Sequence, residues 1–325
     1  MQSTTPNSMS YQDYITQQLN PIWQQRECGF FKASKKAKLY YSKLTSPSHQ
    51  KAVVLVNGRV ESCEKYLELS VELFEQGFDV YSYDHRGQGL SPRLLDDKQK
   101  GYVEFFDDYV DDLELFIKLV TKRRYDNLYL LAHSMGGAIA TRYLQRSPKS
   151  EFSAVALSAP MYGLPLPAYL RPISILYTQL SSALQTKPLY APGYGPYKEK
   201  EFENNPLTHS KARFNWFQSL YHEKEELQLG GPTMRWVWQS LLAMKQCYLM
   251  ARHLPSNLLL LQAEEDTIVD NQAQNRLIAR AQMAGQACQL YQMKGARHEI
   301  LFEEDSTRRH AIEKIISHFN ENPSS

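Results

Sequence analysis

The stretch Leu130-Leu-Ala-His-Ser-Met-Gly-Gly137 joins a short apolar run to a helical pattern, with a serine where the two meet. The apolar run, Leu128–Leu131, has the length and composition of a buried strand. The residues after the serine, up to Leu144, place Ala138, Ala140 and Tyr143 at helical spacing. This stretch therefore predicts a strand, a tight turn and a helix in direct succession.

A serine at such a corner is a candidate nucleophile. Ala132 and Gly136, two positions either side of Ser134, are small enough for a tight turn in which larger side chains would collide. The turn exposes the hydroxyl above the sheet and directs the backbone N–H of Met135 to the same point. His133 is adjacent to the serine, but neighbouring side chains in such a turn point apart, so we expect it to pack or to orient other groups.

The same alternation of strand and helix extends over most of the chain and predicts an α/β fold with a mostly parallel sheet covered on both faces. Amphipathic helices are expected around Glu64–Glu75, Val110–Val120 and Met234–Tyr248, then up to Ala284, and after Ser306 or Thr307 as a cap. The expected strands are Gly29–Lys32, Lys38–Ser42, Ala52–Val56, Phe78–Tyr83, Leu128–Leu131, Ala154–Leu157, Asn257–Leu261 and Cys288–Tyr291.

One segment interrupts the alternation. Residues from about 160 to 250 hold nine of the 16 prolines and three of the 4 tryptophans. A proline- and aromatic-rich insertion between two strands is a candidate lid, or cap, of mainly helical structure. We therefore divide the chain into an N-terminal surface segment (1–27), the first part of the core (28–159), a cap insertion (160–250) and the second part of the core (251–325).

Composition narrows the class of protein. The chain has 325 residues, of which 42% are hydrophobic and 22% charged, so long disorder and fibrous structure are excluded. A net charge of +2 gives no reason to expect a nucleic-acid partner. The first residues lack the pattern of a secretory signal, no apolar run is long enough to cross a bilayer, and the four cysteines form no C-x-x-C pair. These features predict a cytoplasmic protein, with peripheral attachment to the inner membrane left open.

A serine nucleophile needs a base and an acid that orients it. Chemistry in such sheets gathers at the carboxyl ends of the strands, and His298 is the histidine that directly follows the last predicted strand. The strand before it ends in an acidic cluster, from which we choose Asp266 over Glu264, Glu265 and Asp270. The order Ser134, Asp266, His298 is the order expected in α/β-hydrolases.

A second N–H donor for the reacting carbonyl should come from the loop after an early strand, where Gly58 permits close approach and Arg59 supplies the amide. Together with Met135 this predicts an oxyanion hole. The other glycine-rich loop, Asp84–Ser91, does not open a helix, so it predicts no dinucleotide cofactor. We interpret it as a structural loop, with Asp84 a poor rival for the acid. The sequence contains no H-E-x-x-H motif, so no zinc site is predicted.

These motifs, in this order, resemble the serine hydrolases that comprise monoacylglycerol lipases and bacterial lysophospholipases, with bacterial lysophospholipases closest. Three further segments support the resemblance, which covers roughly residues 28–320: Phe202–Leu207, Leu227–Thr233 and Gly295–Ile300. It implies the α/β-hydrolase fold, a Ser134–Asp266–His298 triad, oxyanion donors at Arg59 and Met135, and no cofactor. Asn57 and Ala132 depart from the family, which often has histidine and glycine at these positions.

The resemblance implies a hydrolase that releases a fatty acid from a lysophospholipid, a lipid-like ester substrate. Two alternatives stay open. The same site could act on a monoacylglycerol, a short ester, a thioester or a peptide amide. A different class, a non-hydrolytic binding protein with this fold, would not need the serine–histidine pair, and fold alone does not determine function. Acyl length, head group and oligomeric state are not specified by the sequence.

Overall fold

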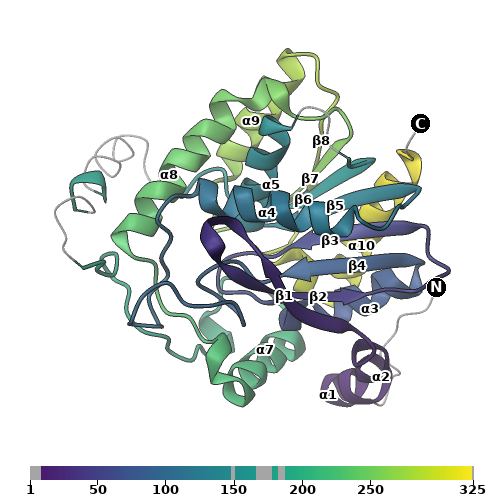
Figure 1. Cartoon of the computed structure of the whole chain (residues 1–325), viewed down its shortest axis with the longest axis horizontal. Helices are drawn as coiled ribbons and strands as arrows, with labels where there is room; N and C mark the ends of the chain where they lie inside the picture. The colour runs from purple at the N-terminus through teal and green to yellow at the C-terminus, as the bar shows by residue number, and fades with distance from the viewer. Residues whose placement is uncertain (1–8, 148–150, 166–177, 182–186, 324–325) are drawn as a thin grey trace.

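Eight strands form one sheet in the order β1-β2-β4-β3-β5-β6-β7-β8 (Figure 1). The computed structural model describes residues 9–147, 151–165, 178–181 and 187–323. Strands β1 and β2 are antiparallel to their neighbours, and the others run parallel. The strands are β1 Glu27–Lys32, β2 Lys38–Leu44, β3 Lys51–Val56, β4 Phe78–Tyr83, β5 Asn127–His133, β6 Ala154–Ser158, β7 Leu258–Ala263 and β8 Gln289–Met293.

The predicted strands are therefore confirmed to within a few residues at their ends. The four central strands β3, β5, β6 and β7 are buried almost throughout, because helices cover both faces of the sheet. Strands buried on two faces read as continuous apolar runs rather than as alternating patterns. That is why short runs such as Leu258–Leu261 were recognisable in the sequence.

Helices fill the connections between the strands. They are α1 Tyr11–Tyr14, α2 Asn20–Trp23, α3 Leu67–Glu75, α4 Asp107–Val120, α5 Met135–Arg146, α7 Lys211–Glu223, α8 Met234–Leu249, α9 Asn271–Met283 and α10 Asp305–Glu321. A π-helical turn, Ile15–Leu19, joins α1 to α2. Short 3-10 turns lie at Ser34–Lys36, Cys63–Tyr66, Phe202–Asn204, Glu225–Leu227, Ala251–His253 and Ile300–Phe302.

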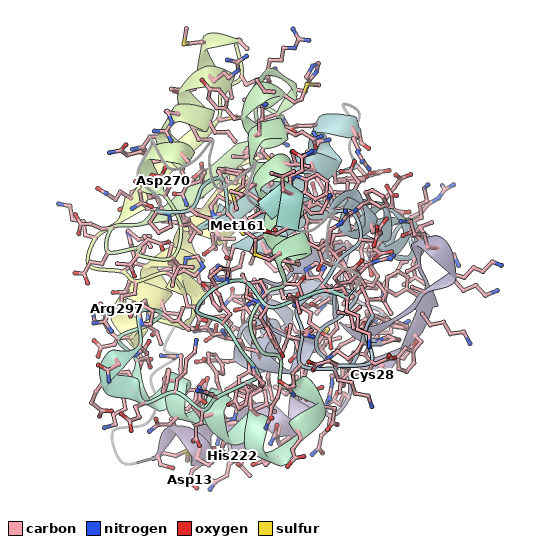
Figure 2. All side chains as sticks on the ribbon, turned by 90° about the vertical axis from the view of Figure 1, so that its left-hand side faces the viewer. Asp13, Cys28, Met161, His222, Asp270 and Arg297 are labelled. Carbon is pink, nitrogen blue, oxygen red and sulfur yellow. The ribbon has the colours of Figure 1, made fainter. Side chains whose placement is uncertain are left out.

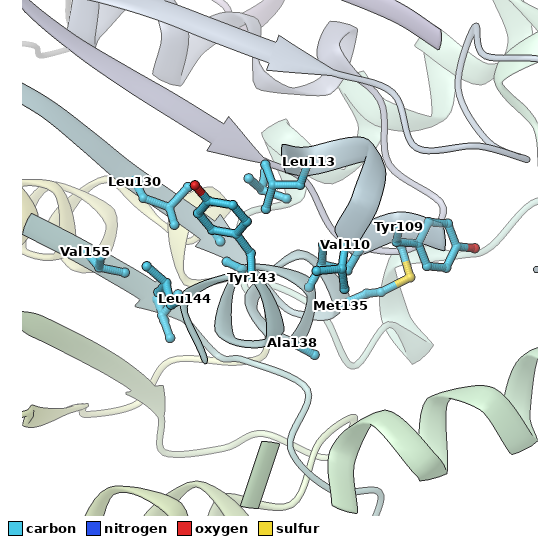
Figure 3. Close-up of a cluster of buried hydrophobic side chains, with 14 of the residues drawn as sticks. Tyr109, Val110, Leu113, Leu130, Met135, Ala138, Tyr143, Leu144 and Val155 are labelled. Carbon is cyan, nitrogen blue, oxygen red and sulfur yellow. The ribbon is translucent and has the colours of Figure 1, made fainter. Parts of the chain in front are cut away.

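Two apolar layers hold the helices on opposite faces of the sheet (Figure 1). One layer contains residues of α4, α5, α8 and α9, and the other contains residues of α3, α10 and the N-terminal helices. In Figure 3, Tyr143 of α5 lies beside Leu130 of β5 and toward Leu113 of α4, and Leu144 lies beside Val155 of β6. Both layers are closed over the central strands.

The N-terminal segment is anchored more firmly than a polar surface segment would be. Ile15, Leu19 and Trp23, spaced four residues apart, are all buried in the second apolar layer. Spacing of this kind puts the three side chains on one face of a helical segment. The segment lies on the surface, and its inner face contributes to the core.

The predicted insertion contains helices of two kinds. Trp236, Met244 and Cys247 of α8 belong to the same apolar layer as α5 and α9. The last helix of the segment 160–250 therefore packs into the core, whereas α7 lies near the N-terminal helices (Figure 1). The division of the chain into domains stays a prediction. Within the described ranges, no helix is both long and apolar enough to cross a membrane.

The predicted cap of the last helix is wrong. Helix α10 begins at Asp305, with Glu304 at the N-cap, so Ser306 and Thr307 lie inside its first turn. An acidic residue in the first turn is favourable because the N-terminal end of a helix is positively polarised. The Arg213 side chain also holds Asp305, with its Nη2 2.8 Å from Oδ1, and this contact with α7 was not visible in the local sequence.

Candidate active site

Ser134 occupies the sharp turn that the sequence predicts. Its φ of 51° lies in the left-handed region, which non-glycine residues rarely adopt, and the Ser134 carbonyl accepts a 2.9 Å hydrogen bond from the Met161 amide. A Cβ at Gly136 would lie 2.4 Å from the carbonyl oxygens of Val56 and Asn57, so glycine is required there for α5 to approach β3. Figure 2 faces this end of the molecule, with Met161 near the centre of the view.

The three residues predicted from distant segments come together. The Oγ of Ser134 lies 2.9 Å from Nε2 of His298, and Nδ1 of His298 lies 2.7 Å from Oδ2 of Asp266. Ser134 is 9% exposed and His298 is 4% exposed, so the row is shielded from bulk water. With Nδ1 protonated and donating to the carboxylate, Nε2 is free to accept the serine proton.

The structure distinguishes Asp266 from the other acidic residues of its loop. Oδ1 of Asp266 accepts hydrogen bonds from the amides of Ile268 and Val269, which turn Oδ2 toward the histidine. Glu264 accepts from the Gly295 amide, and Asp270 caps α9. These rivals are thus committed to other partners. The fourth acid of the loop, Glu265, has an oxygen 3.4 Å from a nitrogen of His209. Asp84, the other carboxylate considered for the triad, accepts hydrogen bonds from the amides of Cys63 and Leu90.

The environment keeps Asp266 ionised. Burial alone would raise its pKa, but the hydrogen bond and charge of His298, together with the amides of Val269 and Ile268, lower the pKa below its usual value. An ionised carboxylate at this position holds the imidazole in one tautomer and stabilises the imidazolium that forms when the histidine takes a proton.

The two backbone amides that the sequence predicts as oxyanion donors have no hydrogen-bond partner among the described residues. Within the described residues, neither the Arg59 amide nor the Met135 amide donates a hydrogen bond. The Met135 amide is at the first turn of α5, where the helix dipole favours negative charge. The Arg59 amide belongs to the loop after β3, next to the close approach of Gly136 to Asn57. The geometry fits acyl transfer through a tetrahedral intermediate.

Comparison with known proteins now identifies the family. Residues 47–305 match the family model Hydrolase_4, described as serine aminopeptidase, S33. The chain belongs to the Hydrolase_4 family. The matched range spans Ser134, Asp266 and His298 together with the loop of Arg59, so the family and the geometry point to the same end of the sheet.

Relatives of this Hydrolase_4 protein cover almost all of its length. Lysophospholipase L2 of Escherichia coli K12 is 39% identical over 93% of this chain and 90% of its own. A probable lysophospholipase L2 of Haemophilus influenzae is 36% identical over 95% of this chain and 96% of its own. In fold, the chain resembles a soluble variant of monoglyceride lipase from Saccharomyces cerevisiae, with a TM-score of 0.70, 20% identity and coverage of 92% and 96%. The α/β-hydrolase fold predicted from the sequence is thus confirmed.

The second glycine-rich loop of this Hydrolase_4 chain, Asp84–Ser91, supports the loop Asn57–Glu61. We call that loop the oxyanion loop, because the sequence predicts an oxyanion donor at its residue Arg59. Gln88 donates to the carbonyls of Gly58 (2.7 Å) and Glu61 (2.9 Å) and accepts from the Val60 amide (3.3 Å). An Nε2 of His85 lies 2.9 Å from the carbonyl oxygen of Asn57. These hydrogen bonds hold the loop Asn57–Glu61, so its amides are fixed in position before substrate arrives. The interpretation of Asp84–Ser91 as a structural loop agrees with these contacts.

Sequence reasoning missed a buried ion network that includes Glu61, at the end of the loop Asn57–Glu61. Nζ of Lys65 lies 2.7 Å from Glu61 and 2.6 Å from Glu299, and all three side chains are buried. Glu61 also accepts from the Gly58 amide at 2.5 Å and the Tyr66 hydroxyl at 2.7 Å. Burial would raise the pKa of Glu61, but Lys65, His133 and Tyr66 lower it to about 2. The lysine therefore links the oxyanion loop to the residue after His298.

His133 packs against the ring of His298. Its ring centroid lies 4.9 Å from that of His298, and its Nδ1 lies 3.1 Å from the carbonyl oxygen of Ser158. Burial lowers the pKa of His133 to about 4, against the opposing effect of Glu61, so it is neutral near pH 7. The imidazole packs and orients, as expected from the turn, and makes no hydrogen bond to Ser134 in the described structure.

Proposed function

We propose that this protein is a lysophospholipase that cleaves the acyl ester of a lysophospholipid through an acyl-enzyme. The observation that carries the proposal is the hydrogen-bonded row Ser134–His298–Asp266 beside two amides without partners in the described structure. The lysophospholipase L2 relatives, which match over more than nine-tenths of this chain, support the choice of substrate.

In the first half-reaction, Oγ of Ser134 bonds to the acyl carbon while its proton passes to Nε2 of His298. The carbonyl oxygen becomes an oxyanion, and the amides of Arg59 and Met135 donate to it. Each such donor typically contributes about 2.7–4 kcal/mol to the transition state. The tetrahedral intermediate then collapses, and the glycerophosphoryl alcohol leaves with the proton from His298.

In the second half-reaction, water attacks the acyl-enzyme. His298 takes a proton from the water, the new oxyanion occupies the same two amides, and collapse releases the fatty acid. The proton returns to Oγ of Ser134, which restores the enzyme. Asp266 holds the imidazole in the required tautomer during both steps and stays ionised throughout.

Contact with a lipid surface is part of the same proposal. Large apolar side chains of the insertion are exposed at Leu180 (52%), Leu189 (53%) and Tyr194 (60%). Tyr194 packs over Gly231, and the neighbouring Gly230 binds the Arg59 side chain, so this apolar surface adjoins the oxyanion loop. Aromatic and aliphatic groups of this kind suit the interface between water and lipid. The cytoplasmic location expected from the sequence stays a prediction.

The decisive experiment compares fatty-acid release from lysophosphatidylethanolamine and from a monoacylglycerol with the same acyl chain. The wild-type protein should cleave the lysophospholipid, and Ser134→Ala should not. Equal release by Ser134→Ala would refute the serine mechanism. Cleavage of the monoacylglycerol alone would refute the proposal that the substrate is a lysophospholipid. If a fluorophosphonate probe failed to label Ser134 and neither ester were cleaved, the protein would instead be a binding protein with this fold.

A further inference from the structure

The Arg59 side chain is a partly buried cation with most of its hydrogen-bonding capacity unused. Its Nη2 donates to the carbonyl oxygen of Gly230 at 2.8 Å, and its guanidinium lies 5.1 Å from the ring centroid of Trp236. Its Nε is buried without a partner, and Nη1 donates to no described residue. A guanidinium has five N–H donors, so one carbonyl satisfies a small part of it.

No carboxylate of the described residues pairs with this charge. Burial lowers the pKa of Arg59 to about 10, and only the phenol groups of Tyr109 and Tyr194 act in the opposite direction. The group is still positive near pH 7. Two other buried arginines are paired, Arg213 with Glu68 and Arg308 with Glu72. A desolvated cation without a counter-ion is unfavourable unless a ligand supplies the anion.

The placement of Arg59 suits the shape of a lysophospholipid. About six bonds separate the backbone nitrogen of an arginine from its guanidinium carbon, and about six separate the acyl carbon of a 1-acyl lysophospholipid from its phosphorus. One residue can therefore donate its amide to the oxyanion and its guanidinium to the phosphate. Arginine binds phosphate oxygens through two parallel hydrogen bonds, which favours it for this task.

We propose that the guanidinium of Arg59 binds the phosphodiester anion of the substrate and selects lysophospholipids over uncharged monoacylglycerols. This inference rests on the proposed function and adds the group that recognises the head group. It assigns to the Arg59 side chain a role separate from that of its backbone amide.

The test measures kcat/KM for lysophosphatidylethanolamine and for the monoacylglycerol of equal chain length in Arg59→Gln and Arg59→Lys. Arg59→Gln should lower the ratio of the two constants by roughly 10- to 100-fold, mainly through KM for the lysophospholipid. Arg59→Lys should recover only part of that loss, since it keeps the charge but cannot form the two parallel hydrogen bonds of a guanidinium.

Arg235→Gln is the matched control. That guanidinium also lies over a tryptophan, 4.8 Å from the ring centroid of Trp238, but it pairs with Glu104 at 3.0 Å. It should leave the ratio unchanged. If wild-type protein cleaves both esters and Arg59→Gln lowers both constants equally, Arg59 is structural and this inference fails while the proposed function stands. If Arg59→Gln does not fold, a wild-type ratio in Arg59→Lys overturns the inference. A wild-type protein inactive on the lysophospholipid refutes the proposed function itself.

Discussion

Nζ of Lys65 lies 2.6 Å from Oε1 of Glu299, although 234 positions separate the two residues. Because Lys65 also pairs with Glu61, one ammonium connects the loop that carries the Arg59 amide with the loop that carries His298. Its methylene stem lies among aromatic rings, with Nζ 4.3 Å from the ring centroid of Phe217 and 4.6 Å from that of Phe302. The oxyanion loop and the catalytic histidine therefore share one buried support.

Removing this lysine should destabilise the protein. Lys65→Met leaves two buried carboxylates without a counter-charge, which typically costs about 3–5 kcal/mol. Urea unfolding monitored by circular dichroism measures the loss. Lys118→Met is the control, since Lys118 and Glu114 form an exposed pair with the same i,i+4 spacing and should contribute less than about 0.5 kcal/mol. Equal losses in the two variants would contradict the importance of the buried network.

The assignment of the triad acid predicts a specific loss of turnover. Asp266→Asn should lower kcat for ester cleavage by roughly 10⁴-fold with little effect on stability, because the amide no longer holds the required tautomer of His298. Glu265→Gln should change kcat less than about twofold, since its side chain faces His209 at the surface. Initial rates on a soluble ester decide between them. A greater loss in Glu265→Gln would transfer the role to that residue.

The turn at Ser134 should not tolerate a methyl group at Gly136. Gly136→Ala places a Cβ against backbone carbonyls of β3, which cannot move without shifting the oxyanion loop, so both the unfolding midpoint and the activity should fall. Gly195→Ala is a suitable comparison, because nothing lies within 4 Å of a Cβ there and its φ is not positive. Thermal unfolding and esterase assays on both variants test this. Full activity in Gly136→Ala would show that the loop is not rigid.

Acid should weaken a second buried ion pair. Burial would raise the pKa of Glu68, but Arg308 and Arg213 lower it to about 2, below the ordinary value of 4.5. A lowered folded-state pKa contributes stability above about pH 4.5, and this contribution is lost as the pH falls toward 2. At pH 7 it amounts to about 3 kcal/mol. Glu68→Gln should therefore be destabilised at pH 7, with the difference from wild type shrinking toward pH 3.

Urea midpoints measured across this pH range for both proteins provide the check. Glu313→Gln, on the exposed face of α10, serves as the reference for a carboxylate whose removal should matter little at any pH. A difference between wild type and Glu68→Gln that stayed constant from pH 7 to pH 3 would show that Glu68 does not titrate with a lowered pKa.

Local patterns were sufficient for the elements and for two of the residues that meet in the candidate site, Ser134 and His298. The buried runs marked the strands because each central strand is covered on both faces. Ser134 was recognisable because a serine between small residues, after a strand and before a helix, has few other structural uses. His298 followed from its place after the last strand. The end of a helix was less predictable: α10 starts at Asp305, before the expected cap, and Asp305 also accepts a hydrogen bond from Arg213 of another helix.

The order of strands and helices along the chain, the serine at the turn and the small residues beside it could be read from the sequence, since each depends on neighbours within a few positions. The sequence also favoured Asp266, but its contact with His298, the link that Lys65 makes between residues 61 and 299, and the Arg59 guanidinium beside Gly230 and Trp236 with no described carboxylate came only with the fold. Hydrogen bonds and ion pairs act over a few ångströms in space, and these partners come within that range only when the sheet has formed.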